Sequence, residues 1–131
     1  MSRVSYLDAS AIVKLIADEE HSAPARRYVE ASDRVATSRV GLVEATRAIR
    51  RRVLVDPADL ERLTGTIAHL ELTGSVSAVA ATLAPPTLRS LDAIHLATAL
   101  EFRDELEAFV TYDDRLADAA RAAGLAVISP V

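Results

Sequence analysis

The sequence predicts an α/β protein with a mostly parallel β-sheet that is covered by helices on both faces. Short apolar runs, which are typical of buried strands, alternate along the chain with segments of helical periodicity. One helical segment, residues 90–100, is apolar almost all round and must be buried on most sides. No repeat, linker or low-complexity stretch divides the 131 residues. We therefore expect three layers, α/β/α, in a single domain spanning residues 1–131.

Composition narrows the class of protein further. Half of the residues are hydrophobic and the mean hydropathy is +0.18, which favours a folded core over disorder. The chain has no cysteine, no signal-peptide pattern and no apolar run as long as a membrane span, so we expect a cytoplasmic protein without membrane contact. Its net charge of −4 argues weakly against a nucleic-acid partner. Every basic residue except Lys14 is arginine, however, and four arginines crowd into positions 47 and 50–52.

The first half of the chain predicts two strands and three helices. A strand over 4–7 ends at Asp8 and leads directly into a helix over 9–17. Ser22 and Pro24 are typical of the start of a second helix, with Ser22 as its N-cap. The remaining elements expected in this half are a strand over 35–38 and a helix over 39–53.

The second half predicts helices separated by weaker strands. Asp56 and Pro57 favour a helix start, and the helical period continues to Leu70, beside a weak strand over 70–72. Pro85 and Pro86 interrupt the chain before the apolar helix, for which Ser90 is the expected N-cap. The other elements expected are a helix over 76–83, a strand over 108–112, a helix over 115–123 that ends at Gly124, and a strand over 125–128.

Three polar residues share one stripe of the apolar helix at 90–100. Asp92, His95 and Thr98 recur at i, i+3 and i+6. An ionised carboxylate is costly to bury without a partner. Asp92 therefore either stabilises the first turn of its own helix or faces a group that attracts negative charge.

Four acidic residues occupy positions that suggest a common site. Asp8 and Asp113 each end an apolar strand, so both should lie at the carboxyl edge of a parallel sheet, where ligands bind in open α/β folds. Glu44 and Asp92 lie on otherwise apolar helices. Four converging carboxylates repel one another unless they bind a cation, and carboxylates without cysteine favour Mg²⁺ or Mn²⁺. The alternative is that Asp8 and Asp113 only cap helices, while Glu44 pairs with arginines at i+3 and i+7.

Four segments together resemble the acidic motifs of PIN-domain proteins, and more narrowly the toxins of VapBC toxin–antitoxin systems. The segments are YLDASAIVKL, SRVGLVEATRAIRR, LRSLDAIHLATAL and FVTYDDRLADAARAAGL. The resemblance spans Tyr6 to Val127. It implies a five-stranded parallel sheet, a Mg²⁺- or Mn²⁺-dependent ribonuclease, a VapB-type antitoxin that inhibits it, and a homodimer.

The same resemblance assigns roles to individual residues. The family's acids match Asp8, Glu44, Asp92 and Asp113, of which we expect Asp8 and Asp92 to be direct metal ligands. Glu44 and Asp113 are expected to bind the metal directly or through water. Ser10 and Thr111 match hydroxyl residues that support the acids. The spacing to Leu116 favours Asp113 over its neighbour Asp114, and His95 is expected to be packed or to support the site rather than to be catalytic.

Two further surfaces are expected to bind partners. Arg47 and Arg51 share a helix face with Glu44, where they either contact RNA phosphates or pair within the helix. The helix at 9–17 is apolar in several directions, which indicates an interface with an antitoxin segment or a second copy of the chain, or burial within its own domain.

Other classes of protein share acids at strand ends. A receiver-like signalling domain also binds Mg²⁺ there, but it needs a lysine after its last strand, and the only lysine is Lys14. A haloacid-dehalogenase-type phosphatase needs a second aspartate two residues after the first, where this chain has Ser10. A PIN-like scaffold without catalysis is the third alternative.

Overall fold

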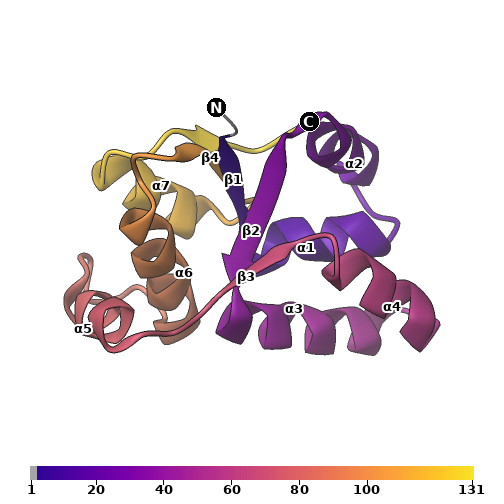
Figure 1. Cartoon of the computed structure of the whole chain (residues 1–131), viewed down its shortest axis with the longest axis horizontal. Helices are drawn as coiled ribbons and strands as arrows, with labels where there is room; N and C mark the ends of the chain where they lie inside the picture. Colours follow the sequence, from indigo (N-terminus) through magenta and orange to yellow (C-terminus); the bar gives the residue numbers. More distant parts are fainter. Residues whose placement is uncertain (1–2) are drawn as a thin grey trace.

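The computed structural model describes residues 3–131 and contains a five-stranded parallel sheet in the order β3-β2-β1-β4-β5 (Figure 1). The prediction of a parallel sheet is confirmed, since all four strand pairs are parallel. β1 is the central strand, with β2 and β4 as its neighbours. The strands are β1 (Val4–Leu7), β2 (Arg34–Ser38), β3 (Ala68–Leu70), β4 (Leu106–Val110) and β5 (Val127–Ile128).

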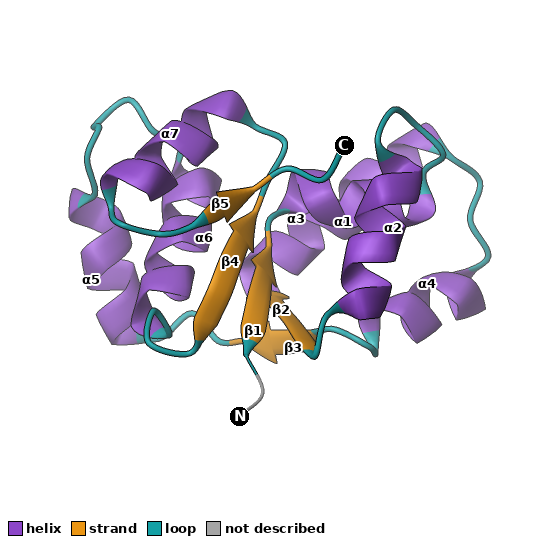
Figure 2. Ribbon diagram, turned by 90° about the horizontal axis from the view of Figure 1, so that it is seen from above, coloured by secondary structure: helices purple, strands orange, loops and turns teal. Residues whose placement is uncertain are grey.

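Helices cover both faces of the sheet, so the predicted three-layer arrangement is also confirmed (Figures 1 and 2). Helices α1 to α4 lie on one side and α5 to α7 on the other. Their bounds are α1 (Ala9–Ile16), α2 (Ser22–Ala31), α3 (Arg39–Arg52), α4 (Pro57–Thr64), α5 (Gly74–Thr82), α6 (Ser90–Glu101) and α7 (Asp114–Ala122). α3 begins where β2 ends and contacts α6, so helices from the two layers meet at the carboxyl edge of the sheet.

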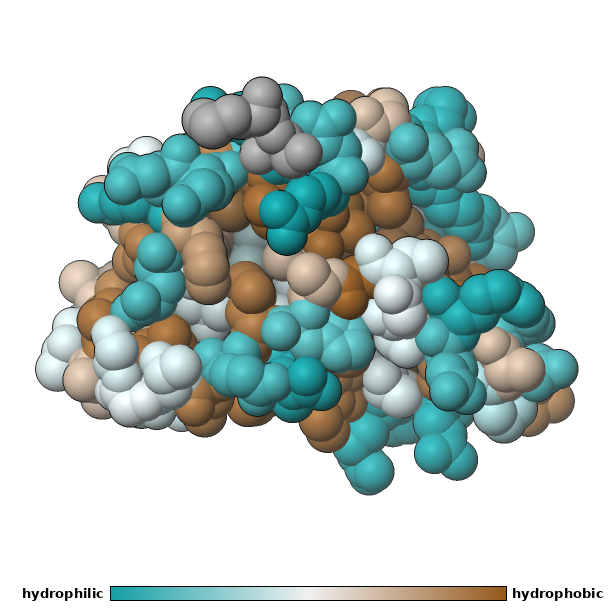
Figure 3. Space-filling model, in the orientation of Figure 1, coloured by the Kyte–Doolittle hydropathy of each residue, from teal (hydrophilic) through white to brown (hydrophobic). Residues whose placement is uncertain are grey.

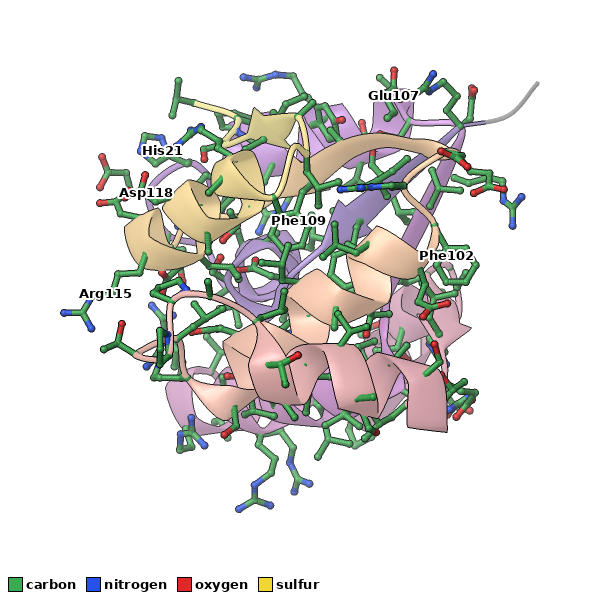
Figure 4. The ribbon with its side chains drawn as sticks, turned by 90° about the vertical axis from the view of Figure 1, so that its left-hand side faces the viewer. His21, Phe102, Glu107, Phe109, Arg115 and Asp118 are labelled. Atoms are coloured by element: carbon green, nitrogen blue, oxygen red, sulfur yellow. The ribbon has the colours of Figure 1, made fainter. Side chains whose placement is uncertain are left out.

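The core consists of two hydrophobic clusters separated by the sheet. One lies under α1 and α3 and includes Ile12 and Ile49, and the other lies under α6 and α7 and includes Leu96 and Phe109. The ring of Phe109 stacks on that of Tyr6 at a centroid distance of 5.3 Å. Figure 4 shows Phe109 in the interior beside α6 and α7, whereas Arg115 and Asp118 of α7 point outward.

The polar stripe of α6 is buried, as the apolar character of this helix predicts. The exposed fractions are 9 % for Asp92, 1 % for His95 and 0 % for Thr98. The Thr98 hydroxyl donates a hydrogen bond to the carbonyl of Ile94 at 2.6 Å, which satisfies it within the helix. Asp92 pairs with Arg89, the N-cap residue of α6, whereas His95 contacts Tyr6 and Glu44 outside this helix.

Both serines predicted as N-caps are instead the first residues of their helices. The N-cap of α2 is His21, which has a φ of 69°, while the Ser22 hydroxyl donates to the carbonyl of Ala17. The N-cap of α6 is Arg89, whose side chain caps nothing. Ser90 lies one residue too late to accept a bond from the first free N–H groups.

Most other element boundaries also differ from the prediction by one or two residues; β4, for example, is Leu106–Val110 rather than 108–112, and α5 is Gly74–Thr82 rather than 76–83. The helix that starts after Asp56 ends at Thr64, because Gly65 follows and the later apolar residues belong to a new strand. That strand is Ala68–Leu70 rather than 70–72, and the last strand is limited to Val127–Ile128. The predicted end of α4 and the predicted bounds of β3 were wrong because the helical spacing of apolar residues continues by chance into the strand.

Candidate active site at the carboxyl edge of the sheet

The four predicted acids come from four elements that converge at one edge of the sheet. The chain leaves β1 toward β2 and β3 on one side, and toward β4 and β5 on the other. In parallel sheets the crevice at such a reversal of strand order is the usual place for a ligand. Asp8 directly follows β1, and Asp113 follows β4 by three residues. Glu44 and Asp92 approach the same edge on α3 and α6, which contact each other.

Asp8 is buried and held by three hydrogen bonds. Only 3 % of its surface is exposed. Its carboxylate accepts from the Ser10 hydroxyl at 2.7 Å, the Ala11 N–H at 2.9 Å and the Thr111 hydroxyl at 2.5 Å. Burial raises the pKa of the Asp8 carboxyl, and the bonds from Thr111 and Ser10 oppose that rise. The bond from Ala11 also makes Asp8 the N-cap of α1. Asp8 therefore caps this helix and at the same time lies at the candidate site.

Ser10 and Thr111 join the loops that follow β1 and β4. The backbone N–H of Tyr112 donates to the Ser10 hydroxyl at 2.9 Å, and that of Asp113 donates to the Thr111 hydroxyl at 3.0 Å. Both hydroxyls thus accept from one loop and donate to Asp8. This arrangement places Asp113 relative to Asp8, while Asp113 caps α7 through the N–H of Leu116.

Asp92 and Asp113 share one guanidinium group. Arg89 lies 3.1 Å from an Asp92 oxygen through Nε and 3.3 Å from an Asp113 oxygen through a terminal nitrogen. Burial raises the pKa of Asp92, Arg89 lowers it, and the charges of Asp113 and Glu44 raise it further. Because the Arg89 side chain is 74 % exposed, each of these ion pairs is weak.

Glu44 contacts His95 rather than an arginine of its own helix. Glu44 Oε1 lies 3.4 Å from His95 Nε2. Within residues 3–131, neither Arg47 nor Arg51 forms an ion pair with Glu44, which overturns the pairing alternative. Both arginines are exposed.

The charges of this edge fit a divalent cation. Four carboxylates face one guanidinium, and in the described part of the chain no basic side chain lies within 4.0 Å of Asp8. Hard oxygen donors of this kind suit Mg²⁺ or Mn²⁺. The carboxylates are nevertheless not gathered as a finished metal site, since no three acidic or histidine side chains within residues 3–131 are close enough to hold an ion. In this structure Asp92 and Asp113 are paired with Arg89 instead.

Gly41 of α3 is required for the contact between α3 and α6. A Cβ atom at this position would overlap the His95 ring, whereas one at Gly74 would meet nothing within 4 Å. We expect Gly41→Ala to lower the free energy of unfolding by about 1–3 kcal/mol through overpacking. Gly74→Ala is the matched control and should be neutral or slightly stabilising. Thermal melts of both variants check this, and equal midpoints would contradict it.

Sequence reasoning missed three residues of this edge. Arg89 precedes Asp92 by three residues, a spacing that is typical of an ion pair on a helix. The sequence alone was therefore sufficient to predict the contact of Arg89 with Asp92. Tyr6 and Gly41 reach His95 only through the tertiary fold, and no local pattern indicates them. The exposed Asp114 contacts none of the four acids through a hydrogen bond or ion pair within residues 3–131, whereas Asp113 contacts Arg89.

Comparison with known proteins identifies the class of fold. The family model of the PIN domain matches residues 5–122. The crystal structure of VapC20 from Mycobacterium tuberculosis, described as a toxin that cleaves the Sarcin–Ricin loop, superposes with a TM-score of 0.74 at 18 % identity, covering 96 % of this chain and 99 % of that one. A toxin–antitoxin complex from Klebsiella pneumoniae contains a chain with a TM-score of 0.69 at 20 % identity, covering 97 % and 98 %.

More similar sequences narrow the class. Ribonuclease VapC47 of M. tuberculosis strain CDC 1551 is 41 % identical over 132 residues, and ribonuclease VapC46 of strain H37Rv is 42 % identical over 130 residues. Each comparison covers 95 % of this chain and 96 % of the relative. The chain therefore belongs to the PIN-domain family and, within it, to the VapC ribonucleases.

Proposed function

We propose that this protein is a metal-dependent endoribonuclease, the toxin of a type II toxin–antitoxin system, and that a VapB-type antitoxin inhibits it. The observation that supports the proposal is that the elements that carry or precede Asp8, Glu44, Asp92 and Asp113 meet at the carboxyl edge of the sheet. Family membership supports the ribonuclease activity. It also removes the receiver-like and phosphatase alternatives, while a non-catalytic scaffold remains an outcome of the assay below.

The proposed way in which each of the four acids binds the metal follows from how deeply its side chain is buried. Asp8 and Asp92, the two most buried, would hold Mg²⁺ or Mn²⁺ directly, because burial strengthens their attraction for a cation. Glu44 and Asp113 are about one third exposed, with side-chain fractions of 32 % and 29 %, and would hold the ion directly or through water. When bound, the ion activates a water nucleophile and neutralises charge on the phosphodiester. Ser10 and Thr111 keep Asp8 fixed during this reaction.

RNA binding is proposed to use the exposed arginines of α3. Figure 3 shows polar side chains projecting from the edge of the molecule formed by α3. Within residues 3–131, Arg47 and Arg51 have no acid within 4.0 Å, so their charges are free to meet phosphates. They lie one and two turns beyond Glu44 on α3.

Removal of these two arginines should weaken RNA binding in a salt-dependent manner. For two lost phosphate contacts to a single strand, the slope of log K against log salt should fall by about 1.4. Arg121→Ala is the control, since Arg121 pairs with Asp118 in the last turn of α7. Fluorescence anisotropy with Arg47→Ala/Arg51→Ala measures the slope, and an unchanged slope would show that both arginines serve only solubility.

The proposed partners are an antitoxin, the RNA substrate and a second copy of the chain. α1 buries Ile12 and Val13 in its own domain, while Leu15 and Ile16 stay partly exposed. Val43 and Leu54 are exposed, and Leu42, Val55 and Leu60 line a groove between α3 and α4. Within residues 3–131, no helix is long and apolar enough to cross a membrane. We further propose that residues 1–131 form a single PIN domain that acts in the cytoplasm.

Cleavage of RNA by the purified, antitoxin-free protein tests the proposed function. We expect cleavage with Mg²⁺ or Mn²⁺ and none with EDTA. Expression of the wild-type chain alone should arrest growth, whereas Asp8→Ala at equal soluble level should not. Intact RNA at every metal concentration, together with normal growth, would favour the non-catalytic scaffold.

A further inference from the structure

A buried hydrogen-bonded chain connects the sheet to His95. Tyr6 is 0 % exposed, and its phenol oxygen accepts the N–H of Ser38 at 3.0 Å. The same oxygen lies 2.7 Å from His95 Nδ1. Burial raises the pKa of Tyr6, so the phenol keeps its proton and donates it to Nδ1. With Nδ1 accepting this bond, the ring proton lies on Nε2.

The Nε2 atom of His95 faces Glu44. The two atoms of this contact, His95 Nε2 and Glu44 Oε1, are buried, and within residues 3–131 neither of them forms a hydrogen bond, although they lie 3.4 Å apart. A buried N–H and a buried carboxylate oxygen left without partners are costly, so their mutual approach at 3.4 Å is the arrangement that reduces the cost. Gly41, one turn before Glu44 on α3, leaves the space that the imidazole fills.

We propose that His95 is a positioning residue for Glu44. Tyr6 fixes the imidazole from one side. On the other side Nε2 lies 3.4 Å from Glu44 Oε1, where a slight closure would let it donate to this oxygen and leave the second carboxylate oxygen for the metal site. Glu44 belongs to this site by position, since α3 contacts α6, the helix that carries Asp92. The inference rests on the proposed metal-dependent function. A histidine that merely fills space would affect folding and leave metal affinity unchanged.

A pair of substitutions separates the two contacts of His95. His95→Asn places a polar atom near the position of Nδ1, which retains the Tyr6 contact but does not reach Glu44. His95→Gln reaches the position of Nε2. On metal-stripped protein, calorimetric titration with Mn²⁺ alone should show about tenfold weaker binding for His95→Asn, the scale typical of partners that orient metal ligands, and recovery of most of that loss for His95→Gln. Melting in EDTA reports folding separately.

A double-mutant cycle with Glu44→Ala tests whether His95 acts through Glu44. We expect the double variant Glu44→Ala/His95→Asn to bind Mn²⁺ as weakly as Glu44→Ala alone, because the positioned group is already gone. Additive losses, or wild-type affinity in His95→Asn, would overturn the proposal. If His95→Asn fails to fold, Tyr6→Phe decides: it keeps the ring stacked on Phe109, and unchanged Mn²⁺ affinity would overturn the proposal.

Failure of the proposed function has a different signature. A wild-type protein that binds no Mn²⁺ in the same titration would overturn the metal site itself, and the positioning role with it. Wild-type binding together with unaffected variants would overturn only the role of His95.

Discussion

Replacing Asp8 by asparagine is expected to reduce RNA cleavage by at least about a hundredfold while the protein stays folded, since loss of one preorganised electrostatic group typically costs 10²–10³ in rate. Asparagine has nearly the same volume, and its carbonyl oxygen still accepts from Ala11 and the Ser10 hydroxyl. The substitution therefore removes the charge that holds a cation while keeping the cap of α1. Initial rates with Mn²⁺, at equal concentrations of folded protein, measure the effect.

Asp114→Asn is the matched control for this experiment. Asp114 lies beside Asp113, is exposed and has no hydrogen bond or ion pair to Asp8, Glu44 or Asp92 within residues 3–131. Its substitution should leave the rate unchanged. A fully active Asp8→Asn protein, or equal losses in both variants, would show that cleavage does not depend on the carboxylate that ends β1.

The second large effect concerns stability without metal. Because the pKa values of Asp8 and Asp92 are raised, the folded state binds protons at these groups more tightly than the unfolded state does. Their stabilising contribution is complete below the unfolded pKa of about 4 and is lost as pH rises through the folded values. In EDTA, the melting temperature of the wild type should therefore rise as pH falls from neutral toward the unfolded pKa of about 4.

Asp92→Asn should weaken this pH dependence and should melt no lower than the wild type at pH 7 in EDTA. The substitution removes repulsion from Asp113 and Glu44, and the ion pair with the exposed Arg89 that it also removes is worth at most about 1 kcal/mol. Addition of Mn²⁺ at a hundred times its dissociation constant should stabilise the wild type by about 2.7 kcal/mol and the variant by less. A destabilised variant with an unchanged response to Mn²⁺ would mean that Asp92 serves the structure alone.

Strand–helix alternation was sufficient to predict the sheet and the positions of two acids. Asp8 and Asp113 follow buried strands, and parallel strands bring their carboxyl ends to one edge of the sheet. The apolar runs and the alternation of strands and helices along the chain were therefore sufficient to predict that the two acids lie at the same edge. Helix starts were less predictable, because Ser22 and Ser90 have the residue type of a cap but lie one position too late. Cap identity depends on the dihedral angles of single residues, which apolar periodicity does not report.

The residues that contact Glu44 could not be predicted from the sequence of its own helix. Its helix carries arginines at i+3 and i+7, which favour pairing on one exposed face. The structure instead turns Glu44 toward His95, because Gly41 lets α3 approach α6 closely. That approach depends on packing between segments about fifty residues apart, a distance at which the periodicity of a single helix carries no information.

The hydrogen bond between Thr111 and Asp8 joins residues that are 103 positions apart. A growing chain that ends before Leu106 already contains Asp8, Glu44 and Asp92, but it lacks both Thr111 and β4, the strand that completes one side of β1. At about 5–20 residues per second, synthesis of the intervening segment takes on the order of 5 to 20 s. Translation thus imposes a delay on this protein, since almost the whole chain must leave the ribosome before the candidate site can form.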